Sequence, residues 1–209
     1  MKKTLLIILA VVVVAIFFVV GKYNTIVKYD ESVTTSWSQV ENVYQRRLDL
    51  IPNLVNTVKG AALQESWVLI AVVNARANAT KVTVDIKDAK SLAEYQQVQG
   101  EVSSSLSKLL AVVESYPTLQ SIQAFRDLMT QLEGTENRIT VERKNFNDAV
   151  NTLNIYIRTF PANIVASLFG FEKAQQFEAK AWADIAPTVD FGTTPATLPA
   201  DTIPTEGTE

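Results

Sequence analysis

The chain of 209 residues contains few side chains that could carry out chemistry, and the first to consider is a serine that precedes a lysine by three residues. Ser105-Leu106-Ser107-Lys108 has the Ser-x-x-Lys spacing with which some acyl enzymes let a lysine activate a serine nucleophile. The pattern is short, it lies in a serine-rich segment, and the partner motifs of those enzymes are missing from the sequence. We therefore favour a solvated helix face, with a serine hydrolase using Ser105 and Lys108 as the less favoured alternative.

The composition excludes several kinds of site, because the chain has neither cysteine nor histidine. Disulfides, thiol nucleophiles, thiolate or imidazole metal ligands and histidine general bases are therefore ruled out. With carboxylates alone as ligands, a buried transition-metal centre is unfavourable. The net charge of -3 gives no footprint for nucleic acid. We expect no enzyme, no catalytic residues, no cofactor, no metal and no nucleic-acid partner.

Two adjacent arginines open the stretch RRLDLIPNLVNTVKG at residues 46–60. On a helical wheel, Arg47 falls about 40° from the centre of the apolar stripe around Ile51, whereas Arg46 points away from that stripe. We therefore expect Arg47 to face inward and Arg46 to face a partner.

Three charged residues flank Ile139 in a later helical segment, and they are Glu136, Glu142 and Arg143. We expect Arg47 to pair with Glu136 or Glu142 across the bundle, in a polar layer that sets the register of the helices. If the pair is fully buried, removal of one partner should cost about 3–5 kcal/mol of stability.

Pro52 lies inside the apolar stripe of the same stretch. Proline has no N–H to donate to the Leu48 carbonyl, so we expect one helix that continues through Pro52 with a kink. The alternative is a new helix that Asp49 caps, with Pro52 in its first turn.

The elements that must position these side chains follow from helical periodicity. Apolar residues recur at intervals of three and four over residues 37–75, 92–116 and 119–160, whereas residues 78–90 break the pattern and are expected to form a loop. Residues 161–185 are interpreted as two short helices around Gly170 that fold back on the bundle, with an interfacial membrane helix at 161–171 as the alternative. The predicted fold is all-α, an elongated antiparallel bundle of three long helices plus a short C-terminal helix pair.

An apolar run from Leu5 to Val20 comes before the bundle. It spans about 24 Å as a helix, and flanking residues and snorkelling lysines can extend it toward the bilayer core of about 30 Å. The bulky residues before Gly21 make a poor cleavage site, so an uncleaved signal anchor is favoured over a signal peptide. The expected domains are an anchor at 1–27, a bundle at 28–186 and a disordered Thr/Pro-rich acidic tail at 187–209.

Five segments within about residues 23–185 resemble the LemA family of bacterial membrane-anchored helical proteins, and they occur in the family's order: YNTIV, RRLDLIPNLVNTVKG, LLAVVESYPTLQS, LEGTENRITVERKNFNDAVNTLN and FPANIVASLFGFEKAQQFE. The chain departs from the family pattern near residues 61–67, where relatives commonly carry an aromatic residue and a histidine before a glutamate. The resemblance implies an antiparallel helical bundle behind one transmembrane helix. It also implies membrane proteases or other envelope proteins as partners.

Together these features predict a non-enzymatic scaffold or adaptor of the bacterial cell envelope that self-associates into a homo-oligomer, with coiled-coil packing. We expect a single-pass protein of the inner membrane, with its amino terminus in the cytoplasm and its bundle in the periplasm. Such a protein would organise membrane proteins or the membrane itself. A sensor or ligand-binding bundle is the alternative, and the lack of a second membrane span or output domain in the sequence weighs against it.

Overall fold

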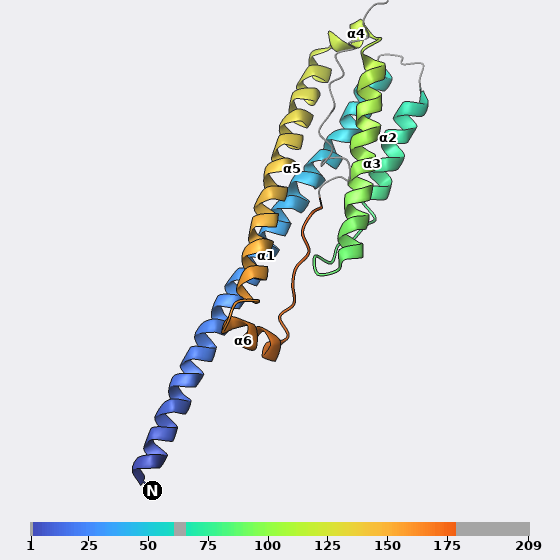
Figure 1. Ribbon diagram of the computed structural model, residues 1–209. Helices are drawn as coiled ribbons and strands as arrows, with labels where there is room; N and C mark the ends of the chain where they lie inside the picture. Colours follow the sequence, from blue (N-terminus) through green and yellow to red (C-terminus); the bar gives the residue numbers. More distant parts are fainter. Residues whose placement is uncertain (1, 61–65, 179–209) are drawn as a thin grey trace, which may run out of the picture. The chain divides into compact units, whose positions relative to one another are not determined.

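The computed structural model describes residues 2–60 and 66–178, and within these ranges it contains helices and no strand (Figure 1). The all-α class is confirmed, because helical periodicity in the sequence matches helices in the structure. The expected disordered tail, and most of the stretch that departs from the family pattern, lie outside the described residues. The described helices are α1 (Lys2–Gly60), α2 (Ser66–Ala79), α3 (Ala89–Val113), α4 (Pro117–Gln120), α5 (Gln123–Tyr156) and α6 (Ala162–Phe169).

Helix α1 continues without interruption from the apolar run into the bundle. Its first part, which includes Leu5–Val20, is largely exposed, and α1 is the one described helix long and apolar enough to cross a membrane. Its second part buries one face of the helix, because from Val33 onward its apolar residues recur at intervals of three and four. The buried apolar residues are Ile26, Val33, Trp37, Val40, Tyr44, Leu48, Ile51, Leu54, Val55 and Val58.

The helix expected at residues 37–75 is two helices in the structure. Helix α1 ends at Gly60, a residue with low helix propensity, and α2 begins at Ser66. Helix α2 packs mainly on α3, while α5 packs along α1 (Figure 1).

Two apolar clusters form the core. One surrounds Trp37, whose ring lies 5.4 Å from Tyr95, 5.3 Å from Phe146 and 5.8 Å from Phe177 between centroids. The other joins the last turns of the α1 helix to α2, α3 and the start of α5. Aromatic pairs at these separations add to the stability that apolar burial provides.

The C-terminal part of the bundle differs in detail from the expected helix pair. Among the described residues after α5, which end at residue 178, α6 is the one helix, and the segment from Phe171 to residue 178 has no helical structure. The Asn154 amide accepts from the backbone N–H of Ala174 at 3.1 Å and donates to its carbonyl at 2.9 Å. The Asn147 amide makes the same pair of bonds with Phe177, at 2.9 and 3.3 Å. These two α5 side chains satisfy backbone groups that a helix would otherwise pair internally.

Residues 80–88 form the connecting loop expected between helices. The loop is not loose, because Val82, Val84 and Ile86 pack against the cluster around Trp37. The Ile86 carbonyl also accepts a hydrogen bond from the backbone N–H of Gln175 at 2.9 Å. Val82, Val84 and Ile86 alternate with other residues as in a strand, and in this loop the alternation reflects packing of one side against the cluster.

Candidate functional site

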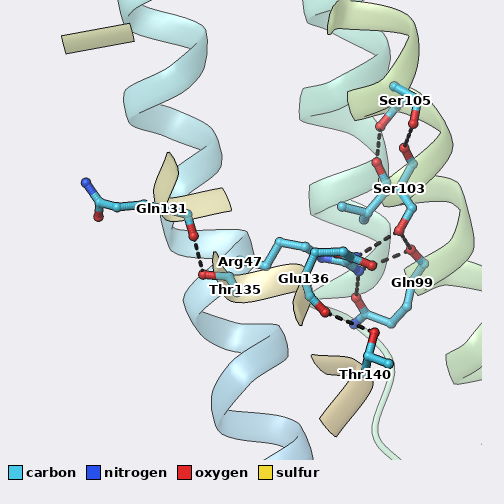
Figure 2. Close-up of polar contacts among 10 residues, drawn as sticks. Arg47, Gln99, Ser103, Ser105, Gln131, Thr135, Glu136 and Thr140 are labelled. Atoms are coloured by element: carbon cyan, nitrogen blue, oxygen red, sulfur yellow. Dashed lines mark hydrogen bonds and ion pairs between the residues drawn. The ribbon is translucent and has the colours of Figure 1, made fainter. Parts of the chain in front are cut away.

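A buried polar layer separates the two apolar clusters, and it is centred on Arg47. On α1, Arg47 lies between residues of the Trp37 cluster and residues of the other cluster. Gln99 holds the same place on α3, and Glu136 holds it on α5. Arg47 and Gln99 are buried, whereas Glu136 is exposed and reaches the layer from its rim, and the three side chains meet at one level (Figure 2).

The guanidinium of Arg47 uses all four hydrogens of its two terminal nitrogens. Nη1 donates to Ser103 Oγ at 2.8 Å and to Glu136 Oε2 at 3.1 Å. Nη2 donates to the Gln99 Oε1 at 2.6 Å and to the Gln99 backbone carbonyl at 3.1 Å. Only the buried Nε–H has no hydrogen-bond partner among the described residues. The arginine is therefore held mainly by partners on α3, with one carboxylate from α5.

The two ends of the ion pair differ in exposure, since the side chain of Arg47 is 2% exposed and that of Glu136 is 54% exposed. A groove of about 510 Å³ opens beside them between α3 and α5, and its walls are largely apolar. Because the terminal nitrogens are already fully used, no Nη hydrogen is left to bind an anion in this groove. The layer is thus suited to hold helices together rather than to carry out a reaction.

The remaining predicted layer residues make other contacts, and Arg143 borders the layer through its contact with Tyr44. Glu142 accepts a hydrogen bond from Asn145 Nδ2 at 3.0 Å, and the guanidinium of Arg143 lies 4.5 Å from the centroid of the Phe177 ring. Arg46 is exposed. Arg47 and Glu136 are therefore brought together, whereas Glu142 and Arg143 make separate contacts; the proposed role of the layer in helix register stays a prediction.

Two tyrosines adjoin the layer, with the rings of Tyr44 and Tyr95 in an edge-to-face pair at 5.4 Å. Burial raises the pKa of the Tyr44 hydroxyl above its ordinary value of 10.0, although the nearby Arg143 and Arg47 oppose that rise. Burial also raises the pKa of Tyr95, and the neighbouring Tyr44 adds to this effect. Both hydroxyls therefore stay protonated at neutral pH, and neither is poised as a base.

Sequence reasoning missed Gln99 and Ser103, which supply three of the four acceptors of Arg47. The sequence contains a pattern that identifies Gln99 as a core position. Gln99 continues the spacing of Tyr95, Val102 and Leu106, so a polar residue stands at a core position of its helix. A polar residue in an apolar stripe predicts a buried polar partner from another helix.

The Ser105 hydroxyl donates to the Val102 carbonyl of its own helix at 2.9 Å and is buried, whereas Lys108 is exposed. This arrangement gives no support to an activated serine. Within residues 2–60 and 66–178, no cluster of three or more acidic side chains is placed to hold a metal ion.

Comparison with known proteins matches residues 36–191 to the LemA family. Two relatives, magnetosome proteins MamQ 1 and MamQ 2 of Paramagnetospirillum magneticum, are each 31% identical to the chain over 185 residues, which cover 78% of this chain and 67% of the relative. Magnetosome protein MamQ of Magnetospirillum gryphiswaldense is 28% identical over 187 residues, with the same coverage.

Proposed function

The chain belongs to the LemA family, and from this premise we propose that it is a non-enzymatic scaffold or adaptor of the bacterial cell envelope. It is a membrane-associated helical protein, and we propose that residues 1–27 anchor it in the inner membrane with the amino terminus in the cytoplasm. The bundle at residues 28–186 would then act in the periplasm. Its relatives are named as magnetosome proteins, and by analogy we propose that this chain also works within an assembly at a membrane.

The observation that carries this proposal is the continuity of α1 from the apolar span into the bundle core. A continuous helix fixes the position of the bundle relative to the anchor, because the backbone hydrogen bonds of the helix oppose bending between the two. The polar layer of Arg47, Gln99 and Glu136, in which the arginine and the glutamine are buried, also favours a specific bundle over interchangeable helix packings. Such a protein is suited to present a fixed surface near the membrane.

An exposed apolar stripe on α2 supports self-association. The side chains of Trp67, Ile70 and Val73 are 60%, 58% and 45% exposed, and they follow each other at intervals of three residues on one helix. Ile70 and Val73 line a groove of about 410 Å³ that Lys59 also lines. Apolar side chains clustered in this way are typical of interfaces, and a second copy of this chain is the partner that we propose.

Cysteine crosslinking in membranes tests the proposal, because the chain has no natural cysteine. We expect an Ile70→Cys variant to form a crosslinked dimer with a bis-maleimide reagent in intact cells. Asn151→Cys, at an exposed polar position on α5, is the matched control and should stay monomeric. A monomer in both cases, with no envelope protein recovered by an amine crosslinker, would contradict the scaffold.

Protease treatment tests the proposed orientation. We expect the bundle to survive protease added to intact cells and to be digested after the outer membrane has been opened. Digestion only after the inner membrane is lysed would place the bundle in the cytoplasm instead. The result for orientation is independent of the crosslinking result for self-association.

A further inference from the structure

We propose that α6 is a membrane-interface helix whose outward apolar face enters the lipid next to the α1 anchor. The proposal rests on the anchorage of α1 proposed above, and it adds a second contact between the bundle and the bilayer. The lipid surface on the side of the bundle is the partner.

The outward face of α6 is more apolar than contact with water would favour. Ala162, Val165 and Ala166 are buried against the bundle. On the other side, large apolar residues stand out, and the segment from Thr159 to Phe171 contains no charged residue. The exposed fractions are 75% for Phe160, 58% for Ile164, 73% for Leu168 and 51% for Phe169. A face of this kind needs an apolar partner.

The packing of α6 places this face at the edge of the membrane span. The ring of Phe169 lies 4.9 Å from that of Tyr23, and the ring of Phe171 lies 5.6 Å from it. Tyr23 is three residues past Val20, which corresponds to about 4.5 Å along a helix. Figure 1 shows α6 beside α1, between the start of the chain and the other helices.

The length of the apolar run explains why lipid should reach α6. A helix needs about 20 residues to cross a hydrocarbon core of roughly 30 Å. Counted from Leu5, such a span ends near Asn24, beyond the end of the apolar run at Val20. The level of Tyr23, and with it the exposed face of α6, therefore coincides with the boundary between hydrocarbon and headgroups.

The cations that an interfacial helix requires come from its neighbours, because α6 itself has none. Lys22 Nζ lies 5.5 Å from the centroid of the Phe18 ring and 5.9 Å from that of Tyr156, so the lysine runs along aromatic surface at this level. Arg158 is exposed just before α6. Both positive charges suit the phosphates of lipid headgroups, while the apolar face meets acyl chains.

Depth-dependent quenching on the full-length protein tests the proposal. Single-cysteine variants Ile164→Cys and Leu168→Cys are labelled with an environment-sensitive fluorophore. They are reconstituted into phosphatidylethanolamine–phosphatidylglycerol vesicles with lipids that carry a nitroxide quencher high on the acyl chain. Val141→Cys is the matched control, because Val141 is an apolar residue of α5 that is 54% exposed. Phe17→Cys, inside the apolar run, is the positive control.

We expect the labels on α6 to emit at shorter wavelength than the Val141 label and to lose most of their emission to the quencher, as the Phe17 label does. Water-like emission without quenching at residues 164 and 168 would overturn the proposal. Short-wavelength emission that the lipid quencher leaves unchanged would also overturn it, because a protein partner would then cover the face. If the Phe17 label is not quenched, the anchorage itself fails, and this inference fails with it.

Discussion

Arg47 shows how one buried charge can be held mostly by neutral groups. Its partners Gln99 and Ser103 are uncharged, and its one carboxylate partner, Glu136, is more than half exposed. Water screens the attraction of an exposed carboxylate, whereas a buried amide oxygen cannot be replaced by water without rearrangement. The neutral acceptors should therefore contribute more to stability than the ion pair does.

The first prediction compares the two kinds of partner. Gln99→Leu removes the side-chain acceptor that lies 2.6 Å from Arg47 Nη2 and leaves a buried donor unpaired. We expect it to destabilise the bundle by about 1–3 kcal/mol. Glu136→Gln, the control, should cost only about 0–1 kcal/mol because the carboxylate is largely in water. Thermal unfolding of the full-length protein in mild detergent, followed by circular dichroism, measures both. Equal losses, or a larger loss in Glu136→Gln, would contradict the prediction, because the ion pair would then contribute at least as much as the neutral acceptor.

The second prediction concerns alkaline pH. Burial raises the pKa of Tyr44 and of Tyr95, so above the ordinary value of 10.0 the unfolded chain loses these protons while the folded chain keeps them. The stabilisation is complete below pH 10, and it is lost as the pH rises toward the higher pKa of the folded state. Stability should fall by at most about 1.4 kcal/mol per pH unit for each tyrosine.

Unfolding measured at increasing pH checks this expectation. Replacement of both tyrosines by phenylalanine keeps the rings and should flatten the decline above pH 10. Tyr29→Phe, on the same helix as Tyr44 but only partly buried, is the control and should leave the decline in place. An unchanged decline in the double variant would assign it to other groups.

At the scale of elements, Pro52 links α1 to α2. Proline cannot donate to the Leu48 carbonyl, yet α1 continues through this position. The free carbonyl accepts a hydrogen bond from Arg76 Nε of α2 at 2.9 Å. The proline thus creates an acceptor on α1, and the acceptor is used to dock the next helix. Because α1 is continuous from Lys2 to Gly60, no new helix starts after Asp49. The kink at Pro52 stays a prediction.

The third prediction is a coupling between Pro52 and Arg76. Arg76→Met leaves the Leu48 carbonyl unpaired and should cost about 1–2 kcal/mol. In a Pro52→Ala background the alanine N–H can bond to that carbonyl, so the same change should cost less, with a coupling of at least about 0.5 kcal/mol. Arg138→Met, an exposed position on α5, is the control for loss of an arginine. Additive effects in the double-mutant cycle would show that the carbonyl is not shared.

Helical periodicity was enough to predict the all-α class, the inward position of Arg47 and the outward position of Arg46. It could not choose Glu136 over Glu142, because both flank Ile139 and only the packing of α5 on α1 decides which of them reaches the guanidinium. It also could not predict the non-helical segment after α6. That segment depends on amide side chains of Asn147 and Asn154, and a helical wheel does not show what a distant chain will bring to them.

At the scale of the whole molecule, the boundary between anchor and bundle is set by packing. The expected boundary follows residue 27, yet Ile26 is fully buried in the cluster around Trp37, and Tyr23 contacts Phe169. The residues just after the apolar run therefore belong to the core of the bundle by their contacts. The division of the chain at residue 27 stays a prediction that truncation can test.

The last prediction compares two soluble truncations, one starting at Gly21 and one starting at Lys28. The shorter chain lacks Ile26 and Tyr23, so α6 loses the helix surface on which it packs. Loss of the buried Ile26 side chain alone should remove about 1.5–3 kcal/mol of stability. We expect the chain from Lys28 to melt at lower temperature, and we expect faster amide hydrogen exchange in α6 while α3 keeps its protection. Ile26→Ala in the longer chain is the matched control and should destabilise that chain by about 2–5 kcal/mol, because the substitution also leaves a cavity. Equal melting temperatures and equal protection of α6 in the two truncations would place the boundary after residue 27, because residues 21–27 would then contribute nothing to the bundle.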